Sequence, residues 1–403
     1  MDRRLSRRDA LKLAAAGTGT LLAGGLRFGA RSAQAGPLVA GIVKDLPGGV
    51  LIPRGTNAEM NWGSMAGIDY LTPIDRFFVR NHTATTFVNP ATWRLEVFGT
   101  GLRGRPERGK GKRFSLKDLD KLPRESRTVF VECAGNGRSY FGSQEGRTAP
   151  GTAWGLGAIG VAQWTGVPLR EVLERAGVRP DAVDVMPEGL DSAVPAADGT
   201  DQGHVRRPIP IAKAVDDTLI ALEMNGQDLP YDHGYPARVI VPGYVGIANI
   251  KWLGAIEVAD HALFSPWNTT QYRLVGPTYP VDQPPLTTQP LKSAFEVASG
   301  RAFKAGVPVQ LRGRSWSGTS RPRSVRVSTD GGVTWTGAPT HGPNLENAWL
   351  RWTVDWTPTK TGPTALLAQA TDRSGHQQPD HVPFNRDGYL YDGIARLPVT
   401  VTA

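Results

Sequence analysis

The sequence is poor in cysteine and has no long apolar run. Among its 403 residues there is one cysteine, Cys133, so no disulfide bridge can form within the chain. Zinc or iron–sulfur sites built from clustered thiolates are excluded for the same reason, and so is a Cys-x-x-Cys-His haem attachment. No apolar stretch is long enough to cross a membrane, so we expect no stable membrane anchor. Stability must come from a hydrophobic core, and thiolate chemistry has one candidate residue.

The positive charge is concentrated near the start of the chain. The formal net charge is +9, but residues 1–35 hold seven basic and two acidic side chains, which leaves +4 for the remainder. A surplus this small over so long a chain does not require nucleic acid or another polyanion as a partner.

Residues 1–35 are typical of an export signal. A basic start precedes the short apolar stretch 11–26 and the small-residue motif Ala33-Gln34-Ala35. The segment 6–12, Ser-Arg-Arg-Asp-Ala-Leu-Lys, resembles the twin-arginine signal, with Ala10 where phenylalanine is commoner. That route carries proteins that fold before export, which usually means that a cofactor is inserted in the cytoplasm. We therefore expect a periplasmic or extracellular protein; the alternative is a disordered basic tail.

Length and composition predict two domains. The 48 glycines and 32 prolines indicate many turns and short strands. In the first part, 36–288, the run 128–132 predicts a strand, and 168–177 predicts an amphipathic helix that begins at a proline and ends at a glycine.

The pattern changes near a proline-rich stretch at 277–290. From there on, short alternating apolar runs are separated by turn signals such as Asp330-Gly331-Gly332, with almost no helical period. The second part, 289–403, is therefore predicted to be an immunoglobulin-like β-sandwich. The expected strands lie at 307–316, 323–328, 350–356, 364–371 and 395–401.

Cys133 is the sharpest chemical feature. It ends the predicted strand 128–132 and precedes Ala134-Gly135-Asn136, so a strand delivers the thiol into a tight turn. A thiolate is a soft ligand suited to transition metals, and neighbouring glycines let a bulky cofactor approach. By residue type alone, a buried structural cysteine is the commoner outcome. A cysteine nucleophile would need a nearby histidine, which the sequence does not place.

Five colinear blocks resemble the sulfite oxidase family. They are Arg80–His82, Cys133–Asn136 and the stretches 151–169, 232–258 and 314–335. The resemblance spans nearly the whole chain after the export signal. It implies an α+β protein with a mixed α/β molybdopterin-binding domain (36–288) and an immunoglobulin-like dimerisation domain (289–403). It also implies a molybdenum–molybdopterin cofactor and a homodimer.

The resemblance implies roles for particular residues, with Cys133 as the protein ligand to the metal. The positions at which the family contacts the pterin and its phosphate are held by Asn81, His82, Asp191, His233, Arg238 and Lys251. The substrate side is held by Arg80, Arg138, Trp154, Tyr272 and Arg386. Guanidinium groups suit an oxyanion such as sulfite, and a tyrosine can hydrogen-bond it or direct proton flow.

Three positions depart from the family pattern. Arg386 directly follows Asn385, whereas the family more often has one residue between the asparagine and the arginine. Gly137 and the pair Ala248-Asn249 stand where the animal enzymes have an arginine and an Arg-His pair. The offset bears on whether Arg386 reaches the site, whereas the other two departures remove positive charge, which predicts weaker oxyanion binding, a different contact to the cofactor phosphate, or a related substrate.

The reaction implied by the resemblance is the oxidation of sulfite to sulfate by oxygen-atom transfer, with electrons passed to an external acceptor such as a cytochrome c. Alternatives on the same fold are a sulfane dehydrogenase-like subunit of thiosulfate oxidation and another oxyanion or sulfoxide oxidoreductase. A cofactor-free binding protein is a different class, which predicts no molybdenum in the isolated protein. An adhesion protein built on the sandwich would leave residues 70–260 unexplained.

Overall fold

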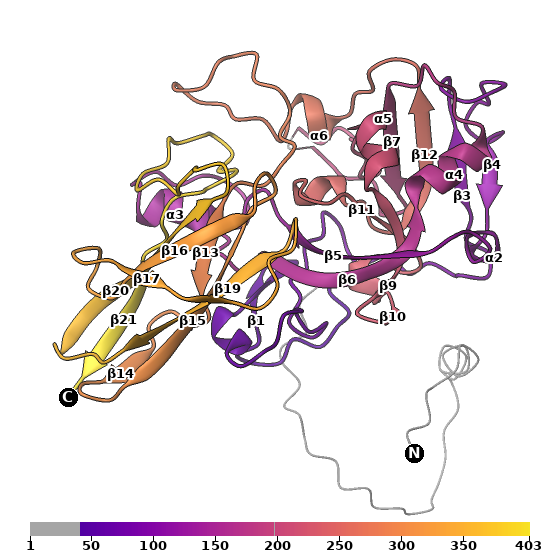
Figure 1. The fold of residues 1–403 in the computed structure, drawn as a ribbon. Helices are drawn as coiled ribbons and strands as arrows, with labels where there is room; N and C mark the ends of the chain where they lie inside the picture. The colour runs from indigo at the N-terminus through magenta and orange to yellow at the C-terminus, as the bar shows by residue number, and fades with distance from the viewer. Residues whose placement is uncertain (1–40, 197) are drawn as a thin grey trace, which may run out of the picture. The chain divides into compact units, whose positions relative to one another are not determined.

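Two sheets and a β-sandwich make up the described chain, which is residues 41–196 and 198–403 of a computed structural model (Figure 1). The predicted export signal lies outside these residues. The described part opens on a short antiparallel hairpin and a 3-10 turn, namely β1 (Leu51–Arg54), β2 (Asn57–Met60) and η1 (Trp62–Met65). Within the described residues, no helix is both long and apolar enough to span a membrane.

The first sheet carries the cysteine. Its strands run antiparallel in the order β10-β9-β6-β5, with β11 also paired to β9. They are β5 (Glu125–Glu132), β6 (Ile159–Pro168), β9 (Leu219–Met224), β10 (Gln227–Asp228) and β11 (Arg238–Ile240). The last four residues of β5 are buried, because the strand passes between apolar layers on both faces. The predicted strand 128–132 is thus confirmed, and it ends directly before Cys133.

The second sheet is mixed, because β12 pairs parallel with β3 and antiparallel with β7. Its order is β4-β3-β12-β7-β8, built from β3 (Leu95–Phe98), β4 (Lys112–Phe114), β7 (Asp184–Gly189), β8 (Ile209–Pro210) and β12 (Leu253–Ala259). Short helices and 3-10 turns connect the strands: α2 (Leu116–Leu119), α3 (Arg138–Ser143), α4 (Leu169–Ala176), α5 (Ile211–Asp216), α6 (Pro266–Thr269), η2 (Tyr231–His233) and η3 (Gly246–Ala248).

Helix α4 joins the two sheets into one core. It is the predicted amphipathic helix, and it ends where Gly177 adopts a φ of +86°, a left-handed conformation that favours glycine. Its buried residues Leu169, Val172 and Leu173 belong to the same apolar cluster as residues of both sheets. This core packs together the strands whose ends carry the predicted site residues.

The C-terminal part is a sandwich of two sheets, β13-β15-β19-β18 and β14-β21-β20-β16-β17. The strands are β13 (Lys292–Phe295), β14 (Ala302–Lys304), β15 (Val309–Trp316), β16 (Pro322–Ser328), β17 (Thr336–Ala338), β18 (Thr340–His341), β19 (Trp349–Trp356), β20 (Gly362–Asp372) and β21 (Leu397–Thr402). Apolar residues of both sheets, including Leu311, Trp352 and Leu366, form one core. The predicted fold class, a mixed α/β part followed by a β-sandwich, is confirmed, whereas the boundary at 288/289 stays a prediction.

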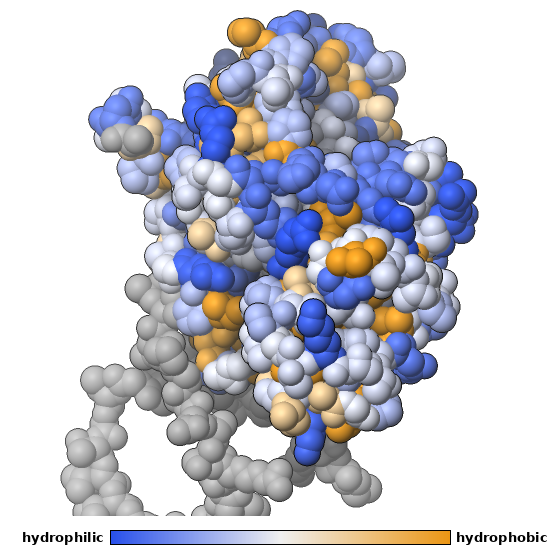
Figure 2. All heavy atoms as spheres, turned by 90° about the vertical axis from the view of Figure 1, so that its left-hand side faces the viewer, coloured by the Kyte–Doolittle hydropathy of each residue, from blue (hydrophilic) through white to orange (hydrophobic). Residues whose placement is uncertain are grey.

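Buried contacts join the sandwich to the first part of the chain. The indole rings of Trp62 and Trp316 stack with centroids 5.8 Å apart. Arg314, on β15, is buried beside Glu296 at 2.6 Å and donates to the carbonyls of residues 68, 69 and 70. On the face shown in Figure 2, apolar side chains form small separate groups among polar ones rather than one large patch.

Candidate active site

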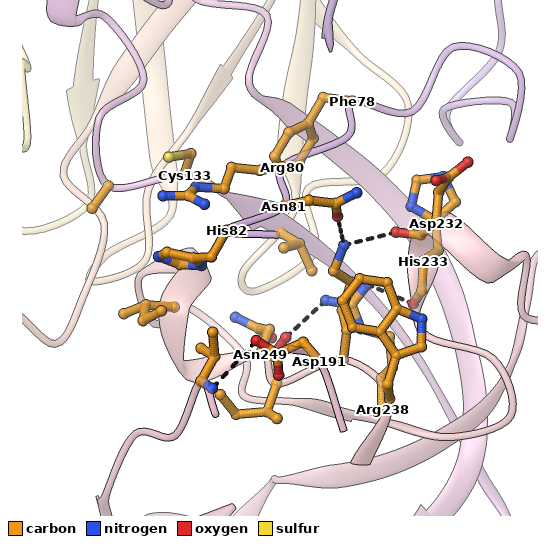
Figure 3. A pocket seen from close by; sticks show the side chains of 18 of the residues that line it. Phe78, Arg80, Asn81, His82, Cys133, Asp191, Asp232, His233, Arg238 and Asn249 are labelled. Carbon is orange, nitrogen blue, oxygen red and sulfur yellow. Dashed lines mark hydrogen bonds between the residues drawn. The ribbon is translucent and has the colours of Figure 1, made fainter. Parts of the chain in front are cut away.

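One pocket collects most of the predicted site residues (Figure 3). It encloses about 740 Å³ not filled by protein atoms, including its open mouth. Nine of the twelve predicted residues line it: Arg80, Asn81, His82, Cys133, Asp191, His233, Arg238, Lys251 and Tyr272. They come from segments that are far apart in the sequence, so their convergence is a result of the tertiary fold. Their individual roles stay predictions.

Backbone hydrogen bonds fix the turn that presents Cys133. Its amide donates to the carbonyl of Ala158 at 3.0 Å, and its carbonyl accepts from the amide of Asn136 at 2.9 Å. The Asn136 side-chain oxygen in turn accepts from the Ala158 amide at 2.9 Å. A Cβ added at Gly246 would lie 2.6 Å from the Glu132 carbonyl, so only glycine lets that segment pass so close to the turn. The thiol is half-buried and faces the pocket, near Arg80 (Figure 3).

Two histidines form part of the pocket wall. Burial lowers the pKa of His82 well below its ordinary value, and the nearby cations Arg80 and Lys251 act in the same direction. Burial likewise lowers the pKa of His233, with further contributions from Lys44, Lys251 and others. Both rings are therefore neutral at pH 7. Nε2 of each ring is buried and has no hydrogen-bond partner among the described residues, so each can bind a ligand.

Two cations lie buried at the pocket. Arg238 donates to the carbonyls of His233 and Asn249, each at 3.0 Å, and burial lowers its pKa to about 9. Lys251 donates to the side-chain oxygen of Asn81 and to the carbonyl of Asp232, and burial lowers its pKa well below the ordinary value. Arg238 Nε and Asn249 Nδ2 are buried without a partner in the described part of the chain. Paired cations with free donors suit a phosphate or another anion.

Asp191 and Asp232 supply acceptors at the same pocket. Burial raises the pKa of Asp191, whose carboxylate accepts a 3.3 Å hydrogen bond from the amide of Val205. Asp232 is a pocket residue that we did not predict. Its carboxylate accepts from the amides of Val43 and Lys44, the latter at 2.7 Å, and from the hydroxyl of Thr85. Its position within the block 232–258 was the one signal that could have marked it.

Asn249, which lines the pocket, and Lys44, whose amide bonds the pocket residue Asp232, were also missed. The Lys44 amine donates to the carbonyls of Ile74 (3.0 Å) and Phe77, and burial lowers its pKa to about 7. It lies in the irregular segment after the export signal, where no local pattern distinguishes it. We singled out Asn249 in the sequence only because Ala248-Asn249 stands where the animal enzymes have an Arg-His pair. Its side-chain oxygen accepts from the amide of Val241 at 2.8 Å, which leaves its amide nitrogen for a ligand.

Three predicted substrate-side residues do not line the pocket. Trp154 is buried behind Phe78, and the two rings meet edge to face with their centroids 6.4 Å apart. Arg138 is buried, and its guanidinium donates to the carbonyls of Thr152 and Asp387, each at 3.0 Å. Arg386 is more than half exposed and pairs with its neighbour Asp387 at 3.1 Å.

Tyr272 is held rigidly at the pocket. Its φ of +56° is unusual for a residue with a side chain, and its ring stacks on that of Tyr389 with centroids 5.0 Å apart. The guanidinium of Arg138 lies 5.5 Å from the Tyr389 ring, on the same stack. Burial raises the pKa of Tyr272, opposed by Arg80 and other cations, so its phenol is neutral at pH 7 and can donate a hydrogen bond.

Comparisons with known proteins now add to this geometry. The family described as the oxidoreductase molybdopterin binding domain matches residues 82–267. Chicken (Gallus gallus) sulfite oxidase is 35% identical over 332 residues, which is 78% of this chain and 69% of the chicken protein. The chain belongs to the sulfite oxidase family. The match also accounts for the part of the chain that an adhesion protein would leave unexplained.

Other relatives show how far the similarity extends. Mouse (Mus musculus) mitochondrial sulfite oxidase is 36% identical over 351 residues, or 82% of this chain, but the chain spans 62% of the mouse protein. The crystal structure of the sulfane dehydrogenase SoxCD from Paracoccus pantotrophus aligns with a TM-score of 0.71 and 28% identity over 86% of this chain and 84% of that chain. The chain is thus a molybdopterin-dependent oxidoreductase with a molybdenum–molybdopterin cofactor, as the sequence resemblance implied.

The pocket residues fit this cofactor. Four buried polar atoms there have no partner among the described residues: His82 Nε2, His233 Nε2, Arg238 Nε and Asn249 Nδ2. Burying a polar atom without a hydrogen bond costs about 1–3 kcal/mol, so a set of four implies a polar ligand. A pterin offers donors and acceptors along its edge, and its phosphate suits Arg238 and Lys251.

The neutral histidines predict a pH dependence of stability. Above the ordinary pKa of histidine, the ring is neutral in both the folded and the unfolded chain. Below it, His233 binds a proton in the unfolded chain but stays neutral in the folded one. Each such histidine therefore lowers the free energy of unfolding by up to about 1.4 kcal/mol per pH unit as the pH falls below about 6.5.

In cofactor-free protein, we expect His233→Gln to lose less stability than wild type between pH 7.5 and 5.5, measured by urea unfolding. His381→Gln, at an exposed position, should behave as wild type; equal losses in all three would contradict the assignment.

Proposed function

We propose that this chain oxidises sulfite to sulfate by oxygen-atom transfer and passes the electrons to an external acceptor such as a cytochrome c. The observation that carries the proposal is the convergence of Cys133, Arg80 and Tyr272 on the pocket whose other residues fit the cofactor. The similarity to animal sulfite oxidases supports the substrate. The homodimer expected from the family is part of the same proposal.

The cofactor residues divide by chemistry. His82, His233 and Asn249 have free ring or amide nitrogens for the polar edge of the pterin, and Arg238 with Lys251 carries the charge for its phosphate. Cys133 supplies a thiolate to the metal. When bound, the cofactor supplies the metal centre that exchanges an oxygen atom and two electrons with the substrate.

The protein binds and orients the substrate. Arg80 lines the pocket near Cys133, and its planar guanidinium can meet two oxygens of an oxyanion at once. Tyr272 holds a neutral hydroxyl at the same pocket and can donate to a third oxygen. Because Tyr272 is clamped by Tyr389, the donor needs little reorganisation during the reaction.

A second candidate is a sulfane substrate, as in a sulfane dehydrogenase-like subunit of thiosulfate oxidation. One specific observation favours it: of the three arginines predicted on the substrate side, Arg80 lines the pocket, whereas Arg138 is bonded to carbonyls and Arg386 is exposed. Less positive charge at the site suits a substrate with less negative charge than sulfite. The alignment with sulfane dehydrogenase SoxCD supports this alternative.

The metal-ligand assignment is tested by Cys133→Ser. We expect sulfite-dependent reduction of cytochrome c to fall by more than the roughly 10- to 100-fold that loss of an outer partner of a metal ligand costs. Metal analysis should find molybdenum in the wild type. Full sulfite oxidation by the serine variant would overturn the ligand assignment. If the wild type contains molybdenum but does not oxidise sulfite, sulfite is excluded as the substrate. An assay with thiosulfate-derived sulfane sulfur would then test the alternative.

The substrate assignment of the arginines is tested by a matched pair of variants. Arg80→Gln removes a charge-assisted hydrogen bond worth about 1.5–3 kcal/mol, so the KM for sulfite should rise roughly 10- to 100-fold. Arg386→Gln should leave kcat and KM within about twofold, because Arg386 is exposed and paired with Asp387. Steady-state kinetics with sulfite at constant ionic strength measure both. Equal effects of the two variants would contradict this placement.

We also propose export by the twin-arginine route, on the basis of Arg7, Arg8 and the motif Ala33-Gln34-Ala35. The protein should collect outside the cytoplasm with Gly36 as its first residue, as N-terminal sequencing would find. Replacing both arginines by lysine keeps the charge but should retain the protein, loaded with molybdenum, inside the cell. Export of the double variant at the wild-type level would refute this route.

A further inference from the structure

A buried ion pair lies directly behind Cys133. Glu132 ends β5 and is fully buried, and its carboxylate lies 2.8 Å from the amine of Lys292, which is 1% exposed. Because successive residues of an extended strand point to opposite faces, the Glu132 side chain points away from the pocket that Cys133 lines. Neither Glu132 nor Lys292 lines that pocket.

Both ends of the cysteine turn are bonded to this pair. One oxygen of Glu132 accepts from Lys292 and from Asn136 Nδ2, each at 2.8 Å. Lys292 also donates to the backbone carbonyl of Asn136 at 3.0 Å. Since Asn136 closes the turn onto the Cys133 carbonyl, the pair holds the residue before the cysteine and the last residue of its turn.

The donors to Glu132 come largely from the C-terminal sandwich. Lys292 lies on β13, and Trp316, on β15, donates its indole N–H to the second carboxylate oxygen at 2.9 Å. Gln289, just before β13, donates to the Glu132 backbone carbonyl at 2.7 Å. The sandwich thus reaches the turn that presents the thiol, and every oxygen of the buried carboxylate has a donor.

We infer that Glu132 and Lys292 are positioning residues that fix the direction in which the Cys133 thiolate meets the metal, and that the sandwich imposes this direction. The inference rests on the proposed role of Cys133 as metal ligand. The orbital overlap between a thiolate and a metal depends on the direction of the Cβ–S bond, which the backbone of the turn sets. Partners that orient a metal ligand in this way tune the metal without touching it.

The sandwich offers a matched control for a purely structural tether. Arg314 and Glu296 form a second ion pair at 2.6 Å, with side chains 0% and 4% exposed. Arg314 also bonds the first part of the chain, through the carbonyls of Asp69 and Tyr70. No hydrogen bond links this pair to the turn from Cys133 to Asn136 among the described residues. Disrupting it should weaken the protein without altering the metal.

The variants are chosen to change bonding at nearly constant shape. Glu132→Gln replaces one acceptor oxygen by an NH2 group, which must then face a donor: Trp316 in one orientation, Asn136 and Lys292 in the other. Lys292→Met removes the donors and keeps the length of the side chain. The double variant Glu132→Gln, Trp316→Phe removes the indole donor, so the oxygen of the introduced glutamine can still accept from Asn136 and Lys292 while its NH2 group faces no donor; it serves as the rescue.

The experiment uses the full chain loaded with molybdenum cofactor and compares the electron paramagnetic resonance spectrum of the one-electron-reduced metal. We expect shifted g-values in Glu132→Gln and Lys292→Met, with kcat for sulfite lowered roughly 10- to 100-fold and KM changed less than about threefold. Glu296→Gln should lose thermal stability but keep the wild-type spectrum. The double variant should return toward the wild-type spectrum.

Several outcomes would overturn the inference. These are a wild-type spectrum in metal-loaded Glu132→Gln, or an equal shift in Glu296→Gln. If neither single variant accumulates with metal, the double variant decides: a wild-type spectrum supports the inference, and a shifted one refutes it. Failure of the proposed ligand role is distinguishable, because Cys133→Ser would then give the wild-type spectrum.

Discussion

Buried positive charge that forms no direct ion pair with a carboxylate of the described residues is the constraint on which the active site depends. Arg238 and Lys251 are withdrawn from water, and their hydrogen bonds go to carbonyl and amide oxygens rather than to carboxylates. Withdrawing each ion from water costs several kcal/mol after relaxation. A bound anionic cofactor offsets this cost, so cofactor binding and folding of this region are thermodynamically linked. A cofactor that stabilises the folded chain is consistent with the proposal that the protein is loaded before export.

The same constraint explains why so much of the chain surrounds the pocket. Asp232 accepts hydrogen bonds from the amides of Val43 and Lys44, so the first described residues support a residue of the pocket wall from behind. Its backbone carbonyl accepts from Lys251, which also bonds Asn81. One cation is therefore held by segments separated by 170 residues. Such a site requires the complete tertiary fold.

Local sequence patterns predicted those strands, turns and helices that interactions between neighbouring residues determine. The run 128–132 and the turn after Cys133 could be placed because alternation and glycine act over a few residues, and α4 because its apolar face and Gly177 are local signals. The family resemblance added nine residues of the pocket. The carbonyl partners of Arg138, and the pairing of Glu132 with Lys292 160 residues away, could not be predicted. They depend on which backbone groups the fold brings together.

Charge at the substrate end of the pocket sets what it can bind. Arg138 lies over Tyr389, which stacks on Tyr272, so this guanidinium affects the pocket through an aromatic stack instead of by contact. The positive charge of Arg138 acts against the rise that burial causes in the pKa of Tyr272, but Arg138 offers no hydrogen bond to a ligand in the pocket. In the proposed function, direct recognition of the substrate is left to Arg80 and the Tyr272 hydroxyl. A compact dianion must exchange many water contacts for these few donors, whereas a singly charged sulfur compound exchanges fewer. Of the two substrates proposed, the choice would therefore depend on the cost of desolvation more than on the shape of the pocket.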